Sequence, residues 1–416
     1  MSYRKFKIFM AGLGPLRLEL GAPQILLHLA TALRQQGHEV TCWTPGPRPT
    51  SVRWWHFIPW ARHALERALV EQGPFDVVDV PPVLITKRVA RLASCVIART
   101  VQPDLLYLAR EITEACRRSL RHPLHSMVVV LYSLYLSGLV VMGYHRASQI
   151  LCLGRFEAEW LRRRFPWLRR KITHYVAAPS PEDRERLQQI RDLRKPSNGP
   201  GTRFLWIGRW SPHKGTRRLI RFIRWRTRTH PHDTFTIAGA GNGAKHDLPA
   251  ELVHSGRVRI LPAFSRDELF DLLATHDVGL FTSVAEGWGL ALHEMLESGM
   301  PVYATETGAV AELRPWFRAS LLEFPPPADG RLARPVPKPL DPDYVEGFSW
   351  TAVSENYLNI CLSILLNEAA PPWKPGDSGP GGAGPLGIQP ASRNNPVRSL
   401  RFGGKPLRRQ SWRTRR

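Results

Sequence analysis

Two glutamates flank a glycine-rich loop in the second half of the chain. Glu286 opens the sequence Glu-Gly-Trp-Gly, and Glu294 follows with seven residues in between. The apolar residues 278–281 before the loop predict a buried strand, and the apolar spacing within residues 292–299 predicts a helix after it. A strand, a glycine loop and a helix N-terminus gather backbone N–H groups and a positive dipole, which favour a phosphate group. Because carboxylates accept hydrogen bonds from neutral hydroxyl groups, we predict that this site binds a nucleotide-sugar.

Two cations follow another predicted strand, at residues 204–208. Arg209 comes directly after this strand and Lys214 five residues later, in the sequence GRWSPHKG. An arginine can donate two parallel hydrogen bonds to phosphate oxygens, and a lysine adds a compact charge. A single cation in so basic a chain is usually solvated, but the position after a strand and the downstream glutamates favour a site. We therefore predict that both cations bind the phosphates.

At these residues the chain resembles the family 4 glycosyltransferases, which have the GT-B fold. Glu286 and Glu294 are similar to the E-x7-E motif of that family, residues 286–305 resemble its EGFGL…EAMA.G.PV.A sequence, and GRWSPHKG resembles its GR…KG element. The resemblance implies an α/β fold with two facing Rossmann-like domains, each with a parallel sheet, and a C-terminal helix that crosses back. It also implies a hexosyltransferase that moves a sugar from a nucleotide-diphosphate sugar to an acceptor hydroxyl with retained anomeric configuration.

The resemblance further implies roles for individual residues. Arg209, Lys214 and the helix N-terminus near Gly289 would stabilise the leaving diphosphate. Glu286 would hold the transferred sugar, and Glu294 would hold the ribose hydroxyls. The implied donor-binding residues are Gly208, Phe264, Gly287, Trp288, Gly289, Leu290 and Glu294. With cations to neutralise the diphosphate, and without a metal-ligand pattern in the sequence, we expect a metal-independent reaction with no cofactor besides the nucleotide-sugar donor.

The N-terminal half predicts a Rossmann-like unit that would hold the acceptor. A strand at residues 6–10 leads into a glycine turn, a helix at residues 23–36 and a second strand at residues 38–43. Further strands are expected at residues 75–80, 94–99, 149–153 and 172–177. The sequence LATALRQQGHEVTCWTP resembles the first helix and second strand of the same family. Gly12, Gly14 and Gln102 are the candidate acceptor or loop residues.

Two positions depart from the family pattern. Pro23 stands where the family usually carries a glutamate before its first helix, and no histidine follows the strand at residues 94–99. Arg99, Gln102 or Asp104 could occupy the space of that histidine. These departures support an alternative function, a catalytically inactive scaffold with the GT-B fold.

The charge of the chain points to anionic partners. A net charge of +23 and a pI near 10.6 favour phosphorylated substrates, an anionic membrane surface or nucleic acid. A basic nucleic-acid-binding or membrane-binding protein is therefore a second alternative, but the sequence has no nucleic-acid recognition motif. The partners we expect are a nucleotide-sugar donor, a glycan or lipid-linked acceptor and an anionic membrane surface, with no specific nucleic acid.

The expected location is the cytoplasm, with peripheral attachment to the inner face of the cell membrane. Five scattered cysteines indicate a reducing compartment, and the apolar run at the N-terminus is too short for a signal peptide. In this setting the enzyme would act in envelope polysaccharide or glycolipid assembly.

One uncharged run, residues 126–144, has about the minimum length for a membrane span. A spanning helix there would cut the N-terminal domain before its last strands, so we favour a buried or partly membrane-facing helix. Of these two, we prefer a core helix to one that docks on anionic lipid. The expected organisation is an acceptor domain at residues 1–178, a linker at 179–201, a donor domain at 202–348, a closing helix at 349–369 and a disordered basic tail at 370–416.

Overall fold

The computed structural model of this protein describes residues 5–18, 21–119, 122–195, 199–327, 330–333 and 335–366. All of these residues belong to one compact unit, Met1–Ser378. The predicted basic tail at residues 370–416 lies outside the described residues.

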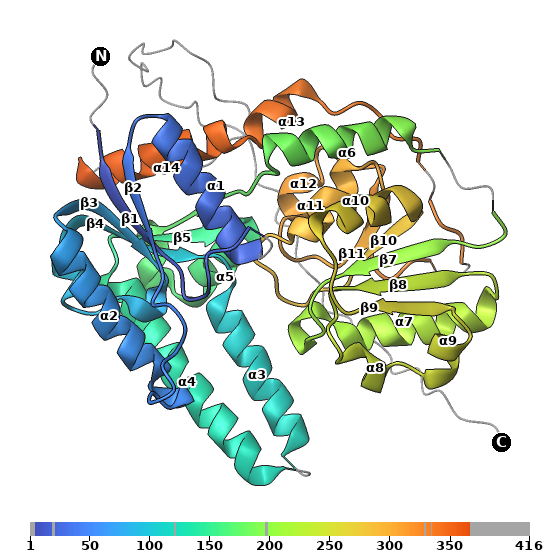
Figure 1. Ribbon diagram of the computed structural model, residues 1–416, viewed down its shortest axis with the longest axis horizontal. Coiled ribbons are helices and arrows are strands. Elements are labelled where there is room, and N and C mark those ends of the chain that lie inside the picture. Colours follow the sequence, from blue (N-terminus) through green and yellow to red (C-terminus); the bar gives the residue numbers. More distant parts are fainter. Residues whose placement is uncertain are drawn as a thin grey trace, which may run out of the picture. The chain divides into compact units, whose positions relative to one another are not determined.

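Two six-stranded parallel sheets form the framework of the described chain (Figure 1). The first sheet has the order β2-β1-β3-β4-β5-β6 and the second the order β12-β11-β10-β7-β8-β9. The first sheet contains β1 (Lys7–Ala11), β2 (Glu39–Trp43), β3 (Phe75–Val80), β4 (Ala93–Thr100), β5 (Gln149–Leu153) and β6 (Ile172–Tyr175). The second contains β7 (Arg203–Ile207), β8 (Thr234–Ala238), β9 (Val258–Leu261), β10 (Val278–Phe281), β11 (Val302–Ala304) and β12 (Leu321–Glu323). We call each sheet with its helices the first and the second lobe.

Helices connect the strands and cover both sheets (Figure 1). In the first lobe these are α1 (Gly21–Gln35), α2 (Phe57–Gln72), α3 (Asp104–Arg118), α4 (Pro123–Arg146) and α5 (Arg155–Arg164). In the second they are α7 (Thr216–Thr229), α8 (Ala244–Asp247), α9 (Ala250–His254), α10 (Arg266–Thr275), α11 (Leu290–Glu297), α12 (Val310–Leu313) and α13 (Pro342–Gly347). The short 3-10 turns used below are η1 (Trp54–His56), η2 (Pro82–Leu84) and η5 (Pro212–Lys214). The two-sheet α/β architecture confirms the predicted fold class.

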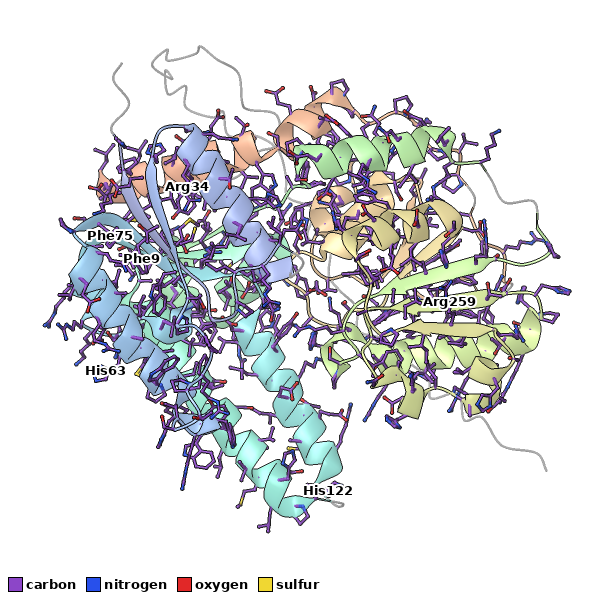
Figure 2. All side chains as sticks on the ribbon, viewed as in Figure 1. Phe9, Arg34, His63, Phe75, His122 and Arg259 are labelled. Atoms are coloured by element: carbon purple, nitrogen blue, oxygen red, sulfur yellow. The ribbon has the colours of Figure 1, made fainter. Side chains whose placement is uncertain are left out.

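Apolar strands account for the cores of both lobes. Strands β3, β4 and β5 are almost wholly buried, as expected for parallel strands covered on both faces. Phe9 of β1 and Phe75 of β3 meet edge to face, with ring centroids 5.0 Å apart (Figure 2). This geometry suits the ring quadrupoles and adds to the packing between the two strands.

The last helix, α14 (Trp350–Leu365), returns to the first lobe, as predicted (Figure 1). Its Trp350 ring stacks on His28 of α1 with centroids 5.4 Å apart. Gln36 Nε2 after α1 donates a hydrogen bond of 2.9 Å to Ser354 Oγ. The C-terminal helix therefore packs directly on the first lobe after the chain has completed the second.

The segment expected as a linker contains a packed helix, α6 (Pro181–Leu193). Ser180 caps it by accepting a hydrogen bond from Asp183 N at 3.1 Å. Arg184 binds Glu297 of α11 at 2.9 Å, and Arg191 donates to the carbonyl oxygen of Leu296 at 2.6 Å. The charges of this segment therefore tie α6 to α11 and are not simply solvated.

Helix α4 differs from its predicted role as a core helix. It contains the apolar run at residues 126–144, but only 28% of its most apolar window is buried. Among the described residues it is the one helix whose length and composition would suffice to cross a membrane. The preference for a core helix was wrong, because composition does not reveal that α3 and η2 cover only one side of α4.

Candidate active site

The candidate site lies where the strand order of the second sheet reverses. From β7 the chain moves outward to β8 and β9, then returns to place β10 on the other side of β7. The carboxyl ends of β7 and β10 lie at this reversal point, which is where open parallel α/β sheets bind ligands. Arg209 and Lys214 follow β7, and Glu286 follows β10.

Lys214 and Glu286 meet across this reversal point. Lys214 Nζ lies 2.6 Å from Glu286 Oε2, and both side chains are largely covered. Ser283 Oγ donates a second hydrogen bond to the same carboxylate oxygen at 3.0 Å. The sequence thus brings together two of its three predicted catalytic residues, although they are separated by 72 positions.

Backbone contacts hold the two loops together. Thr282 Oγ1 donates to the carbonyl oxygen of Lys214 at 2.8 Å, and Val284 N donates to the carbonyl oxygen of His213 at 2.7 Å. Gly215 has a φ of +71°, and a Cβ there would lie 1.9 Å from the carbonyl oxygen of Thr282. Only glycine fits where the chain at Gly215 passes so close to the Thr282 backbone. Gly215 therefore sets the position of Lys214 before it.

The glycine loop places the N-terminus of α11 at the carboxyl end of β10. Gly289 caps the helix with a φ of +87°, and a Cβ there would lie 2.7 Å from the Phe281 ring. The first-turn N–H groups of a helix have no partner within the helix and carry the positive end of its dipole. The loop therefore aims a site for anionic groups toward the carboxyl edge of the sheet.

Glu294 is buried on α11 and held by an arginine from α10. Glu294 Oε1 lies 2.6 Å from Arg266 Nη1, and Arg266 Nη2 lies 2.7 Å from Asp183 Oδ2 of α6. Burial raises the pKa of Glu294, and the Arg266 charge opposes that rise. Arg266 thus fixes the orientation of the carboxylate that the sequence predicts to hold ribose hydroxyls.

A buried polar chain supports the other side of α11. Trp288 Nε1 donates to His293 Nδ1 at 3.0 Å, so the proton of the neutral imidazole is on Nε2, which lies 2.5 Å from Tyr344 Oη. Tyr344 then donates to Glu297 Oε1 at 2.6 Å. Trp288, predicted to bind the donor, is 1% exposed. Its indole therefore belongs to the core, and Trp288 contributes only its backbone to the surface of the glycine loop.

The remaining donor-side predictions gather at the ends of β7 to β9. A Cβ at Gly239 would lie 3.0 Å from Phe264 Cε1 and 3.7 Å from the carbonyl oxygen of Gly208. A Cβ at Gly208 would lie 3.6 Å from the end of the Lys214 side chain. The structure thus places Phe264 and Gly208 in one neighbourhood with Lys214.

An aromatic pair from both lobes borders the cations. The ring of Tyr107 on α3 stacks on His213, with centroids 4.3 Å apart and planes at 26°. Burial, together with the charges of Lys214 and Arg209, lowers the pKa of His213 to about 4, although Glu286 opposes the shift. His213 is therefore neutral at physiological pH. Arg209 is exposed and acts on both rings through its charge.

The first-lobe predictions divide into two groups. A Cβ at Gly287 would lie 2.2 Å from the carbonyl oxygen of Val101 and 3.5 Å from Gln102 Cα, so Gln102 lies beside the glycine loop. Leu290 of α11 faces Gly21 at the start of α1. Gly12 N instead donates to the carbonyl oxygen of Trp43, and Gly14 O accepts from Thr44, both within the first lobe.

Of the residues that could occupy the space of the missing histidine, Arg99 is committed elsewhere. It is buried, and its Nε lies 2.7 Å from Asp79 Oδ1 on the neighbouring strand. Asp104 begins α3, and burial raises its pKa to about 7. Asp104 therefore remains as a carboxyl group near Tyr107 whose charge can change near neutral pH.

Sequence reasoning missed Arg266, Tyr107 and His213. Arg266 carried one usable signal, because a cation in the first turn of a helix opposes the helix dipole and implies a specific partner. Tyr107 and His213 carried none, since their stacking joins elements of different lobes. Among the described residues, no three His, Cys, Asp or Glu side chains are grouped to hold a metal ion.

Comparisons with known proteins place this site in context. Residues 201–322 match the family described as glycosyl transferases group 1. Glycogen synthase from Mycobacterium tuberculosis (strain ATCC 25618 / H37Rv) is 31% identical over 123 residues, which is 29% of this chain and 29% of the relative. The chain thus matches less than a third of the length of that relative.

Solved structures extend the likeness of fold. Sucrose-phosphate synthase from Thermosynechococcus elongatus has a TM-score of 0.59 and 15% identity, covering 88% of this chain and 100% of that one. The catalytic domain of starch synthase IV from Arabidopsis thaliana, bound to ADP and acarbose, has a TM-score of 0.52 and 11% identity, covering 87% and 94%. At these identities the likeness shows the fold alone.

Proposed function

Residues 201–322 match the group 1 glycosyl transferases in a chain with the GT-B fold, and from this match we propose that the protein is a retaining glycosyltransferase. The donor is a nucleotide-diphosphate sugar, and the acceptor is a hydroxyl group of a glycan or a lipid-linked sugar. The observation that carries the proposal is the 2.6 Å contact between Lys214 and Glu286 at the reversal point of the second sheet.

This pair supplies both kinds of interaction that a nucleotide-sugar needs. The Lys214 ammonium has three donors, of which one goes to Glu286 and the others can go to a phosphate. Glu286, also held by Ser283, can accept from sugar hydroxyls. Arg209 and the N-terminus of α11 add positive potential on the same edge. Because these groups are fixed before the reaction, they can stabilise the negative charge that develops as the diphosphate leaves.

The proposed reaction retains configuration through one face of the sugar. The acceptor hydroxyl attacks the anomeric carbon from the side on which the bond to the diphosphate oxygen breaks, and the departing phosphate oxygen takes the hydroxyl proton. Lys214 and Arg209 compensate the charge of the leaving nucleoside diphosphate. Glu286 orients the sugar and forms no covalent bond. The neutral His213 adds no further positive charge beside Lys214 and Arg209.

Glu294 holds the nucleotide end in this proposal. Its carboxylate, oriented by Arg266, accepts hydrogen bonds from the ribose hydroxyls, and Phe264 lies near the base. The starch synthase IV domain with a similar fold was solved with ADP. That neighbour supports a nucleotide donor, so UDP-, GDP- and ADP-sugars form the natural test panel.

We place the reaction in the cytoplasm, in envelope polysaccharide or glycolipid assembly. Five free cysteines, three of them buried, suit a reducing compartment. The high positive charge suits acceptors that are anionic or are presented at an anionic surface.

The test is a panel of UDP-, GDP- and ADP-sugars incubated with the full chain, with release of nucleoside diphosphate as the readout. We expect turnover of one nucleotide class, a loss of roughly 100- to 1,000-fold in Lys214→Ala, and wild-type rates in the control Lys338→Ala. Lys338 is an exposed lysine of the same lobe.

An inactive scaffold remains the second candidate, because no histidine follows β4 and Arg99 is locked to Asp79. This candidate predicts that no sugar nucleotide is turned over and that Glu286→Gln changes no measured binding. Nucleotide binding without turnover would support the scaffold over the enzyme.

A further inference from the structure

Helix α4 exposes a continuous apolar face on the first lobe. Its exposed side chains recur at intervals of three and four residues, so they lie along one side of the helix. Leu131 and Leu134 at the middle of this side are 59% and 55% exposed. We call this surface the α4 face, and it consists of Leu124, Met127, Val128, Leu131, Leu134, Tyr135 and Met142. A contiguous exposed surface of this kind marks an interaction site.

Aromatic residues from a second element extend the α4 face. Trp54 and Trp55 of η1 are both exposed, and their rings meet edge to face with centroids 5.4 Å apart. The Trp54 ring also contacts Tyr132 of α4, with centroids 4.9 Å apart. Tryptophan and tyrosine rings prefer the boundary between lipid headgroups and acyl chains. They would therefore mark the level at which the protein meets a bilayer.

The charges around the α4 face are mainly positive. Residues 123–145 contain no acidic residue, lysine or arginine, and Arg146 ends the helix. The Arg53 guanidinium lies over the Trp55 ring at 5.3 Å. On the adjacent α3, Arg117 is exposed while Glu114 is covered and paired with arginines. Glu111 is the exposed carboxylate of α3, and it is outnumbered by the cations.

The packing of α4 excludes a membrane span. A Cβ at Gly143 would lie 2.0 Å from the carbonyl oxygen of Pro82 in η2, so the last turn of α4 is locked to the first lobe. The chain then enters β5, an interior strand of the first sheet. Ser126 and Ser133 lie on the covered side. Only one side of α4 is free for lipid, which corresponds to a helix lying in the plane of the interface.

We propose that the α4 face, with Trp54 and Trp55, docks the protein onto the surface of a bilayer that contains anionic lipids. A second copy of the chain is the competing occupant. Lipid is favoured because α4 has a mean hydropathy of 1.9 over its most apolar 18 residues, and its exposed face is bordered by interfacial aromatics and arginines. Figure 1 shows α3 and α4 side by side at the edge of the first lobe, and Figure 2 labels His122 where the two helices meet. The proposal does not depend on the sugar donor.

The test is co-sedimentation of the full chain with vesicles of phosphatidylcholine alone or with added phosphatidylglycerol, at low and high salt. The variant is Leu131→Glu/Leu134→Glu, which places two carboxylates on the face. The matched control is Leu193→Glu on α6, where the leucine is 79% exposed in the other lobe. Thermal unfolding and nucleoside diphosphate binding without lipid serve as controls for folding.

We expect the wild type and Leu193→Glu to bind anionic vesicles and to retain part of this binding at high salt. The double variant should lose at least about tenfold in partitioning at high salt, where purely electrostatic attraction by the basic tail is screened. Equal vesicle binding by all three proteins would overturn the proposal. It would also be overturned if no protein bound vesicles and the wild type formed a dimer that the double variant did not.

Discussion

Replacing Glu294 with glutamine should weaken the grip on the ribose without dismantling the site. The side chain keeps its shape and one acceptor oxygen, but loses the charge that Arg266 faces at 2.6 Å. Hydrogen bonds to a charged group are worth about 1.5–3 kcal/mol, against about 0.5–1.5 kcal/mol for neutral pairs. We therefore expect a loss of about 1–2 kcal/mol, or about 5- to 30-fold in the Kd for the nucleoside diphosphate.

Glu297 provides a matched control on the same helix. It is also buried, and its carboxylate accepts from Arg184 at 2.9 Å and from Tyr344 at 2.6 Å, whereas Glu294 pairs with Arg266. Burial alone would raise its pKa, but the contacts with His293 and Arg184 lower the pKa of Glu297. Its charged form therefore stabilises the fold above the usual pKa of a glutamate, and Glu297→Gln should lower the Tm by several degrees at neutral pH.

The assay is calorimetric titration with the nucleoside diphosphate that binds best and with its 2′,3′-dideoxy analogue. The wild type and Glu297→Gln should both prefer the ribose form, while Glu294→Gln should discriminate little between the two ligands. The reasoning would be refuted if Glu294→Gln kept the full preference for ribose, or if both variants lost it equally.

Three further predictions concern the rest of the chain. Lys214→Met should raise the Kd for nucleoside diphosphate in calorimetry by roughly tenfold or more, because the phosphate loses a charge-assisted donor, and an unchanged Kd would exclude Lys214 from the site. Because the pKa of Asp104 in the fold is raised to about 7, its contribution to stability is largest below its ordinary pKa and is lost as the pH rises through about 7. Asp104→Asn should therefore raise the Tm above neutral pH. It should also flatten the dependence of Tm on pH between the ordinary pKa of aspartate and about 7. Parallel Tm–pH curves for the wild type and the variant would contradict this. Gly143→Ala should destabilise the chain by at least about 1–3 kcal/mol in denaturant unfolding, because the added Cβ meets Pro82 backbone, and an unchanged midpoint would show that α4 is not locked to η2.

Local patterns predicted the strand, loop and helix around Glu286 well. Apolar runs identified β10, the glycine loop gave the break, and the spacing of apolar residues gave α11. The conformation of Gly289 explains why the loop could be predicted from sequence. Gly289 has a positive φ and lies against the Phe281 ring, so only glycine fits there, and that glycine is visible in the sequence.

Contacts across elements escaped the same reasoning. Arg266 reaches Glu294 only because α10 and α11 both pack on α6, and no spacing along the chain encodes that. The exposure of α4 escaped for a related reason. A run that is apolar around most of its circumference fits a core as well as a lipid surface, and only the neighbouring elements decide how much of it is covered.

The central prediction is that a diphosphate binds beside Arg209 and Lys214. The decisive measurement is the Kd of the full chain for a nucleoside diphosphate and for the corresponding monophosphate, repeated with Arg209→Ala/Lys214→Ala. We predict that the wild type binds the diphosphate more tightly and that the double variant loses this preference. Equal affinity for the two nucleotides, or a preference that survives in the double variant, would contradict the claim.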